Sequence, residues 1–158
     1  MKKIVIVIMT IVIIGLTTYF ILFSPFSSKP NIEKPIGSVV NETHIAWLVN
    51  ELGSYKLHSN PVTGEEPEME IVCSKTYDVM IEKGYPNVVE GSATNPDIRI
   101  TTQDQFILEL LNETDVLQNT YEMQQEGKLA IGMLKPQEDL ALKGYITIYN
   151  EITGLFLF

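Results

Sequence analysis

Few side chains in this sequence have the type and the spacing that catalysis or metal binding requires. His44 and His58 are the only histidines, and no cysteine or carboxylate stands near either one at the spacing of a zinc site. No serine has the flanking glycines of a nucleophile elbow, and the glycines are too dispersed for a phosphate-binding loop. We therefore expect no catalytic residue, no bound metal and no cofactor, and we expect both histidines to be solvated.

The remaining candidates are one thiol and one guanidinium group. Cys73 is the only cysteine, so an intrachain disulfide cannot form. It alternates with Met69 and Ile71, which predicts a thiol buried on the apolar face of a strand rather than an intermolecular bridge. Arg99 is the only arginine, and its position between two isoleucines predicts an exposed surface charge rather than an anion site.

The chain is acidic, with a formal net charge of −9 at pH 7. Nucleic acid is excluded as a partner, because binding it requires a basic face that neutralises phosphates. The densest acidic run holds Glu65, Glu66, Glu68 and Glu70, and it lacks the Asp and Asn alternation of a calcium loop. We expect these four carboxylates to lie on a solvated face.

Asn41 and Asn112 each begin an Asn-x-Thr triplet, which is the acceptor form for N-linked glycosylation. Both triplets fall at the ends of predicted helices. They are expected to be modified only if the domain is exported in an organism that glycosylates.

The first residues have the layout of a membrane anchor. Ile4–Phe23 is uncharged and matches the length of about 20 apolar residues that a helix needs to cross a bilayer. A cleavable signal peptide is the alternative, although its apolar core is usually shorter, at about 7–15 residues. Lys2 and Lys3 precede the stretch, so the positive-inside rule places the N-terminus in the cytoplasm. We expect a single-pass membrane protein with an uncleaved signal-anchor.

The sequence then divides into four parts. Residues 1–24 are the expected cytoplasmic stub and transmembrane signal-anchor, and 25–40 are a linker rich in serine and proline. Residues 41–154 are the expected extracytoplasmic domain, and 155–158 are an apolar tail.

Within the domain, periodicity predicts both helices and strands. Apolar residues at helical spacing predict a helix over Ile45–Leu52, another with Asp115 as its N-cap, and a last one over Leu142–Tyr149. Thr102 and Gln105 have the spacing of a capping box, which predicts the start of a further helix. Alternation of apolar and polar residues predicts short strands at Met69–Cys73, Tyr77–Ile81, Val88–Val89, Ile98–Ile100 and Leu129–Met133.

These elements predict an α+β domain. Alternating strands have one apolar face to bury, so we expect helices to cover one side of the sheet. Gly144 is the weak point of the last predicted helix, since glycine inside a helix costs about 1 kcal/mol relative to alanine. The predicted core draws on both kinds of element: Ile45, Leu48, Leu52, Ile71, Val79, Ile98, Ile100, Phe106, Leu110, Ile131 and Ile146.

Part of the domain also resembles a known family. Pro96–Thr101, Glu126–Gly132 and Leu140–Leu142, with a helix between the first two, are similar to the C-terminal half of sterol carrier protein type domains. The strands before them resemble that family's opening meander, and the resemblance extends over Met69–Leu142. It implies a mostly antiparallel sheet of about five strands, covered by helices, with an apolar tunnel that takes lipids.

The resemblance also implies a function. We expect a membrane-tethered domain that binds a lipid or another apolar ligand and is not an enzyme. The residues that would bind the ligand are not assigned by the resemblance and stay unknown. The alternative is a structural or protein-interaction domain of a single-pass membrane protein, with no small-molecule ligand.

Overall fold

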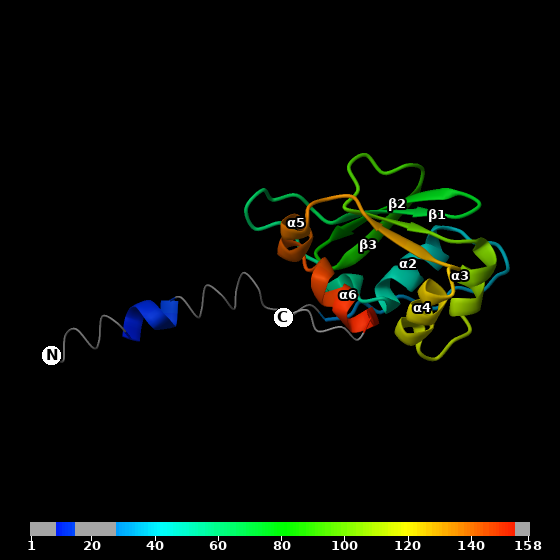
Figure 1. Ribbon diagram of the computed structural model, residues 1–158, viewed down its shortest axis with the longest axis horizontal. Helices are drawn as coiled ribbons and strands as arrows, with labels where there is room; N and C mark the ends of the chain where they lie inside the picture. The colour runs from blue at the N-terminus through cyan, green and yellow to red at the C-terminus, as the bar shows by residue number, and fades with distance from the viewer. Residues whose placement is uncertain (1–8, 15–27, 154–158) are drawn as a thin grey trace.

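The computed structural model describes residues 9–14 and 28–153. A five-stranded sheet with helices gathered on one side forms the body of the second segment (Figure 1). The strands are β1 Glu68–Val72, β2 Thr76–Glu82, β3 Tyr85–Glu90, β4 Ile98–Thr101 and β5 Ala130–Met133. The helices are α2 Glu42–Glu51, the 3-10 turn η1 Ser54–Lys56, α3 Asp104–Leu110, α4 Val116–Gln125, α5 Gln137–Leu142 and α6 Tyr145–Thr153. The structure therefore has the α+β class and the five strands that periodicity predicts.

The strands lie in the order β3-β2-β1-β4-β5, and β1 and β4 are the only parallel neighbours in this sheet. β2 and β3 form a hairpin whose turn residues, Lys83 and Gly84, both have positive φ values of 52° and 80°. A two-residue turn in which both residues have positive φ matches the right-handed twist of the paired strands. The segment that follows β3 then carries the chain to the far side of β1, where β4 adds to the sheet.

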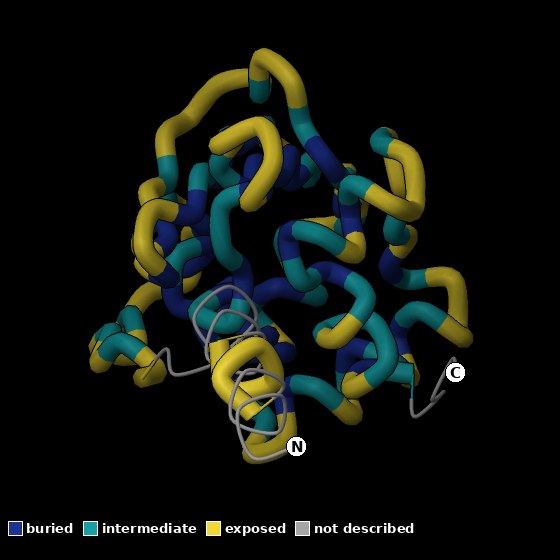
Figure 2. Tube along the Cα trace, turned by 90° about the vertical axis from the view of Figure 1, so that its left-hand side faces the viewer, coloured by how far each residue is buried: buried dark blue, intermediate teal, exposed yellow. Residues whose placement is uncertain are grey.

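The core lies between the sheet and the helices. Tyr77, Val79 and Ile81 alternate along β2 and are fully buried, and α2 packs against β2 and β3. Buried residues gather inside the fold, while the loops are exposed (Figure 2). Seven of the predicted core residues are buried, namely Ile45, Leu48, Leu52, Ile71, Val79, Ile100 and Leu110. The other four pack against this core while partly exposed, namely Ile98, Phe106, Ile131 and Ile146.

The predicted membrane anchor is corrected by the structure. Among residues 9–14 and 28–153, no helix is long and apolar enough to cross a membrane. Of the expected span Ile4–Phe23, only residues 9–14 are described, as a short exposed helix, and the rest lies outside the described residues. The prediction of a single-pass, extracytoplasmic membrane protein is thus unsupported and is not retained.

The described part of the proline-rich segment lies against the domain. Residues 28–40 have no regular helix or strand, yet Lys29 forms an ion pair with Glu51 at 2.5 Å. The side-chain amide of Asn50 donates to the carbonyl oxygen of Pro30 at 3.0 Å, and Val40 is buried. These contacts fasten the segment to α2. The predicted apolar tail, 155–158, lies outside the described residues.

Two helix boundaries differ from the sequence-based prediction. Thr102 does not cap α3, because its hydroxyl donates to the carbonyl oxygen of Lys128 at 3.1 Å, and Gln103 takes the N-cap position without a side-chain bond. The predicted C-terminal helix is two helices, α5 and α6, separated at Gly144. Gly144 has a φ of 91°, which ends a helix and is strained for other residues.

Candidate ligand-binding cavity

An apolar cavity lies between one half of the sheet and the C-terminal helices. The sheet side is formed by Met69 of β1, Ile98 and Ile100 of β4, and Ile131 and Met133 of β5. These residues point to the helical side because alternate residues of a strand face the same side. The parallel pairing places Met69 beside Ile98, and the next pairing places Ile131 beside Ile100. The sheet therefore presents a continuous apolar surface to the cavity.

Helix α6 covers that surface. Its residues Tyr145, Ile146, Ile148, Tyr149 and Ile152 all line the cavity. Their spacing follows the helical repeat, so they form one broad face of α6. α6 packs on α4 and α5 more closely than on β4 or β5. The cavity occupies the space that this arrangement leaves between α6 and the two strands.

The cavity is narrow. Its volume is about 70 Å³. Met133 is 48% exposed, so the lining reaches the surface at the edge strand β5. A thin alkyl chain or a few water molecules match this space, whereas a bulkier ligand requires the walls to move apart.

Besides Tyr145 and Tyr149, two residues with hydroxyl groups lie in this mostly aliphatic lining. Ser54 of η1 and Thr120 of α4 both line the cavity and are 2% and 1% exposed. Neither Ser54 Oγ nor Thr120 Oγ1 has a hydrogen-bond partner within the described segments. No charged side chain belongs to the lining.

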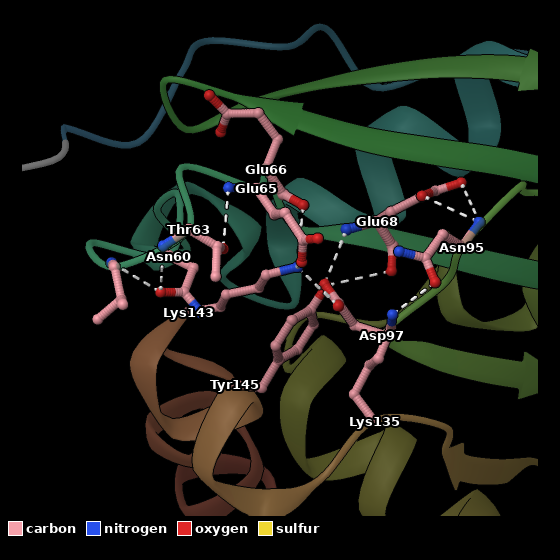
Figure 3. Close-up of polar contacts among 11 residues, drawn as sticks. Asn60, Thr63, Glu65, Glu66, Glu68, Asn95, Asp97, Lys135, Lys143 and Tyr145 are labelled. Carbon is pink, nitrogen blue, oxygen red and sulfur yellow. Dashed lines mark hydrogen bonds and ion pairs between the residues drawn. The ribbon is translucent and has the colours of Figure 1, made fainter.

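A buried polar cluster adjoins the cavity at Tyr145 (Figure 3). The carboxylate of Asp97, which is fully buried, accepts from Lys143 Nζ at 2.7 Å through Oδ1. Its Oδ2 accepts from the Tyr145 hydroxyl at 3.0 Å and from the backbone N–H of Glu68 at 3.0 Å. Lys143 Nζ also donates to the carbonyl oxygen of Glu66 at 3.1 Å. The cluster joins the start of β4, the start of β1 and the junction between α5 and α6.

The side chain of Glu68 extends this cluster. Its carboxylate accepts from the backbone N–H groups of Thr94 at 2.7 Å and Asn95 at 3.2 Å. These bonds hold the segment between β3 and β4 where it passes the start of β1. Burial, followed by the charge of Asp97, raises the pKa of the Tyr145 hydroxyl far above its ordinary value of 10.0. The Tyr145 hydroxyl therefore keeps its proton and donates a hydrogen bond within the cluster.

The structure places the two histidines differently from the prediction. His44 is buried, and its Nδ1 lies 2.7 Å from Oδ1 of Asn41, so the prediction that it is solvated is wrong. The cause is the first turn of α2, which turns His44 toward the core side of the helix. His58 is half-buried, with Nδ1 3.1 Å from the carbonyl oxygen of Ser59.

Cys73 is half-buried rather than fully buried. Its thiol lies 3.3 Å from the carbonyl oxygen of Lys75, to which it donates. Burial, reinforced by neighbouring Asp104, raises the pKa of the thiol above its ordinary value of 9.0. The thiol is therefore a poor nucleophile at neutral pH.

The acidic run splits into two kinds of environment. Glu65 is exposed, but Glu68 and Glu70 are 9% and 5% exposed, so the prediction of one solvated face is wrong for these two. Arg99 is an exposed residue, as predicted, and its Nε donates to Glu70 Oε2 at 2.5 Å. In 9–14 and 28–153, no group of three or more histidine, cysteine or acidic residues is placed to hold a metal ion.

The two glycosylation triplets stay predictions. Asn41 and Asn112 are both exposed. Oδ1 of Asn41 caps α2 by accepting from the backbone N–H groups of Thr43 and His44, and Nδ2 of Asn112 donates to the carbonyl oxygen of Leu108.

The comparisons with known proteins give a likeness of fold. No protein-family model matches the chain, and no curated protein matches it. The structure is similar to that of a UbiJ-SCP2 ubiquinone synthesis protein, at 10% identity, over 78% of this chain and 99% of that chain, with a TM-score of 0.41. A crystal structure of sterol carrier protein 2 like 2 from Aedes aegypti matches at 14% identity, over 63% and 92% of the two chains, with a TM-score of 0.35.

A solution structure of the palmitated Aedes aegypti protein matches at 16% identity, over 70% of this chain and 96% of that chain, with a TM-score of 0.33. The loose resemblance to sterol carrier protein type domains is thus confirmed. At these identities and TM-scores the likeness is one of fold.

Proposed function

We propose that this domain binds an apolar ligand such as a lipid in the cavity beneath α6, without catalysing a reaction. The observation that carries the proposal is the lining, which holds no charged side chain and is almost entirely aliphatic or aromatic. Transfer of apolar surface from water into such a space contributes about 25 cal/mol per Å². A ligand with an alkyl chain gains most from this environment.

Uptake of a lipid requires the cavity to widen, since most small-molecule sites measure about 300–1,000 Å³. α6 is the wall that can move without breaking strand pairing, by pivoting about Tyr145, which is held to Asp97 at the start of the helix. It is joined to α5 through Gly144, whereas β1, β4 and β5 are held together by the hydrogen bonds of the sheet. Movement of α6 away from β5 would enlarge the cavity without breaking strand pairing.

The non-enzymatic part of the proposal is supported by the buried cluster. Both carboxylate oxygens of Asp97 accept hydrogen bonds, and the Tyr145 hydroxyl has a strongly raised pKa. A general base must lie within hydrogen-bond reach of its substrate, whereas Asp97 is fully buried and does not line the cavity. The geometry of Asp97, Lys143 and Tyr145 is that of a structural clamp beside the cavity.

The test is a titration of the full chain with diphenylhexatriene, a hydrocarbon that fluoresces in apolar surroundings. We expect saturable binding, with lipid also detected by native mass spectrometry of the protein as purified. Ile131→Phe places a larger side chain in the cavity and should weaken binding about tenfold or more, because overpacking leaves less room for the ligand.

Val89→Phe is the matched control, because Val89 is 58% exposed on β3 and does not line the cavity. Its affinity for the probe should equal that of the wild type. A wild-type protein that carries no lipid and binds no probe would overturn the proposal and leave the structural or protein-interaction function in its place.

A further inference from the structure

Ser54 and Thr120 are unusual among the residues that line the cavity. A buried hydroxyl almost always has a hydrogen-bond partner, because desolvating it without one is unfavourable. These two hydroxyls are nearly inaccessible and have none in the described parts of the chain. Ser54 belongs to η1, which follows α2, and Thr120 belongs to α4, which packs against α2.

Thr120 lies inside α4, where a threonine can bond to a carbonyl oxygen of its own helix. Thr153 of α6 does so, donating to the carbonyl oxygen of Tyr149 at 2.9 Å. Thr120 makes no such bond although the same option exists in α4. Its hydroxyl has almost no accessible surface in the narrow cavity, so it pairs with a ligand only once the cavity has widened as proposed above.

We infer that the cavity selects apolar ligands that carry an uncharged oxygen group, such as a long-chain alcohol or an ester, and binds that group through the hydroxyls of Ser54 and Thr120. This inference rests on the proposed function and names the chemical class of its ligand. A hydroxyl both donates and accepts, so each of the two residues can pair with an alcohol, and each can donate to a carbonyl oxygen.

The same lining disfavours an ionised ligand. No lysine, arginine or histidine lines the cavity, and the nearby ammonium group of Lys143 is already paired with Asp97. A carboxylate or phosphate there would lose its hydration without gaining a counter-charge. A fatty acid is expected to enter only in its protonated form.

The experiment uses the full chain and two ligands that differ in polarity. 1-Decanol is measured by its displacement of diphenylhexatriene, and diphenylhexatriene, which has no polar group, is measured directly. Ser54→Ala and Thr120→Val each remove one hydroxyl and keep most of the side-chain shape. Each should weaken 1-decanol about three- to tenfold, as expected for one hydrogen bond, and leave the hydrocarbon affinity unchanged. Thr120→Ser keeps a hydroxyl and should retain 1-decanol binding.

The outcomes separate this inference from the proposed function. Equal 1-decanol affinity in wild type, Ser54→Ala and Thr120→Val would mean that the hydroxyls bind water only, and would overturn the inference while hydrocarbon binding still stands. Equal weakening of both ligands would show a loss of cavity shape and would also overturn it. Failure of the wild type to bind diphenylhexatriene overturns the proposed function instead.

A second measurement tests the exclusion of charge. The affinity for decanoic acid should fall about tenfold per pH unit above its ordinary carboxylic pKa of about 4–5, while the affinity for 1-decanol stays constant. Decanoate that binds at pH 8 as tightly as 1-decanol would contradict the selection of uncharged ligands.

Discussion

The hydroxyl of Tyr145 donates a hydrogen bond of 3.0 Å to Oδ2 of Asp97, while the same side chain lines the apolar cavity. Asp97 precedes β4, and Tyr145 is the first residue of α6. This one bond therefore ties the helix above the cavity to the sheet below it. Tyr145 therefore contributes both to the stability of the fold and to the wall of the cavity.

Tyr145→Phe removes that hydroxyl and keeps the ring. Asp97 then loses one of its donors, so the free energy of unfolding should fall by about 1–3 kcal/mol, measured by chemical denaturation. The affinity for diphenylhexatriene should change less than about twofold, because the apolar lining is kept. Tyr149→Phe, in the same helix and the same lining, is the control and should cost less than about 0.5 kcal/mol. An equal loss in the two variants would contradict the role of the Tyr145 bond.

Lys143→Met tests the buried ion pair. Lys143 is 3% exposed and its partner Asp97 is fully buried, so the variant leaves a buried carboxylate without its counter-charge. We expect a loss of about 3–5 kcal/mol in unfolding free energy. Lys75→Met breaks the exposed pair with Glu90, which solvent screens, and should cost far less than Lys143→Met.

A double variant sharpens this test. Replacing Asp97 by asparagine in the Lys143→Met background removes the unpaired charge, so the double variant should be less destabilised than the sum of the two single variants. Simple additivity would show that the two side chains do not act as a pair.

Asp78→Asn should change the pH dependence of stability. Asp78 lies opposite Glu70 in the β1–β2 pairing, and its Oδ1 is buried without a partner among the residues described. Burial, followed by the charges of Glu68 and Glu70, raises the pKa of Asp78 above its ordinary value of 3.8. The folded protein therefore holds this proton more tightly than the unfolded chain does.

The direction of the effect follows from that shift. The contribution of Asp78 to stability is fully present below pH 3.8 and is lost as the pH rises through the higher folded-state pKa. Asp78→Asn should therefore be more stable than wild type at pH 7 and lose this advantage below pH 3.8, measured as melting temperature across the pH range. Glu82→Gln, exposed on the same strand, is the control. A variant that is less stable than wild type at pH 7 would contradict the prediction.

The sequence predicts the elements of this fold better than the contacts between them. The alternation of Ile98 and Ile100 with polar residues is a local signal, and it correctly predicts β4. The sequence also shows Gly144 as a weak point of the predicted helix. It does not show that Gly144 packs against the backbone of Lys56 and Leu57. A Cβ at Gly144 would lie 3.2 Å from the carbonyl oxygen of Lys56, and that approach depends on tertiary packing.

The polar cluster could not be predicted from the sequence. Asp97 and Lys143 are 46 residues apart, and each looks like an ordinary surface charge in its own segment. Ser54 and Thr120 carry no signal either, since serine and threonine are common on exposed surfaces. The anchor prediction failed for a different reason. It rested on hydropathy, length and flanking charge, and among residues 9–14 and 28–153 no helix is long and apolar enough to cross a membrane.

The parallel pairing of β1 with β4 also constrains the order in which the protein folds. Glu70 and Arg99, partners in that pairing, are 29 residues apart, whereas β1, β2 and β3 form from neighbouring hairpins. Closing such a distant contact is entropically slower than forming a hairpin. During synthesis, the meander is complete while one edge of β1 still has unpaired backbone groups. Until β4 arrives, that edge is the place where a nascent chain can pair with a second copy and aggregate.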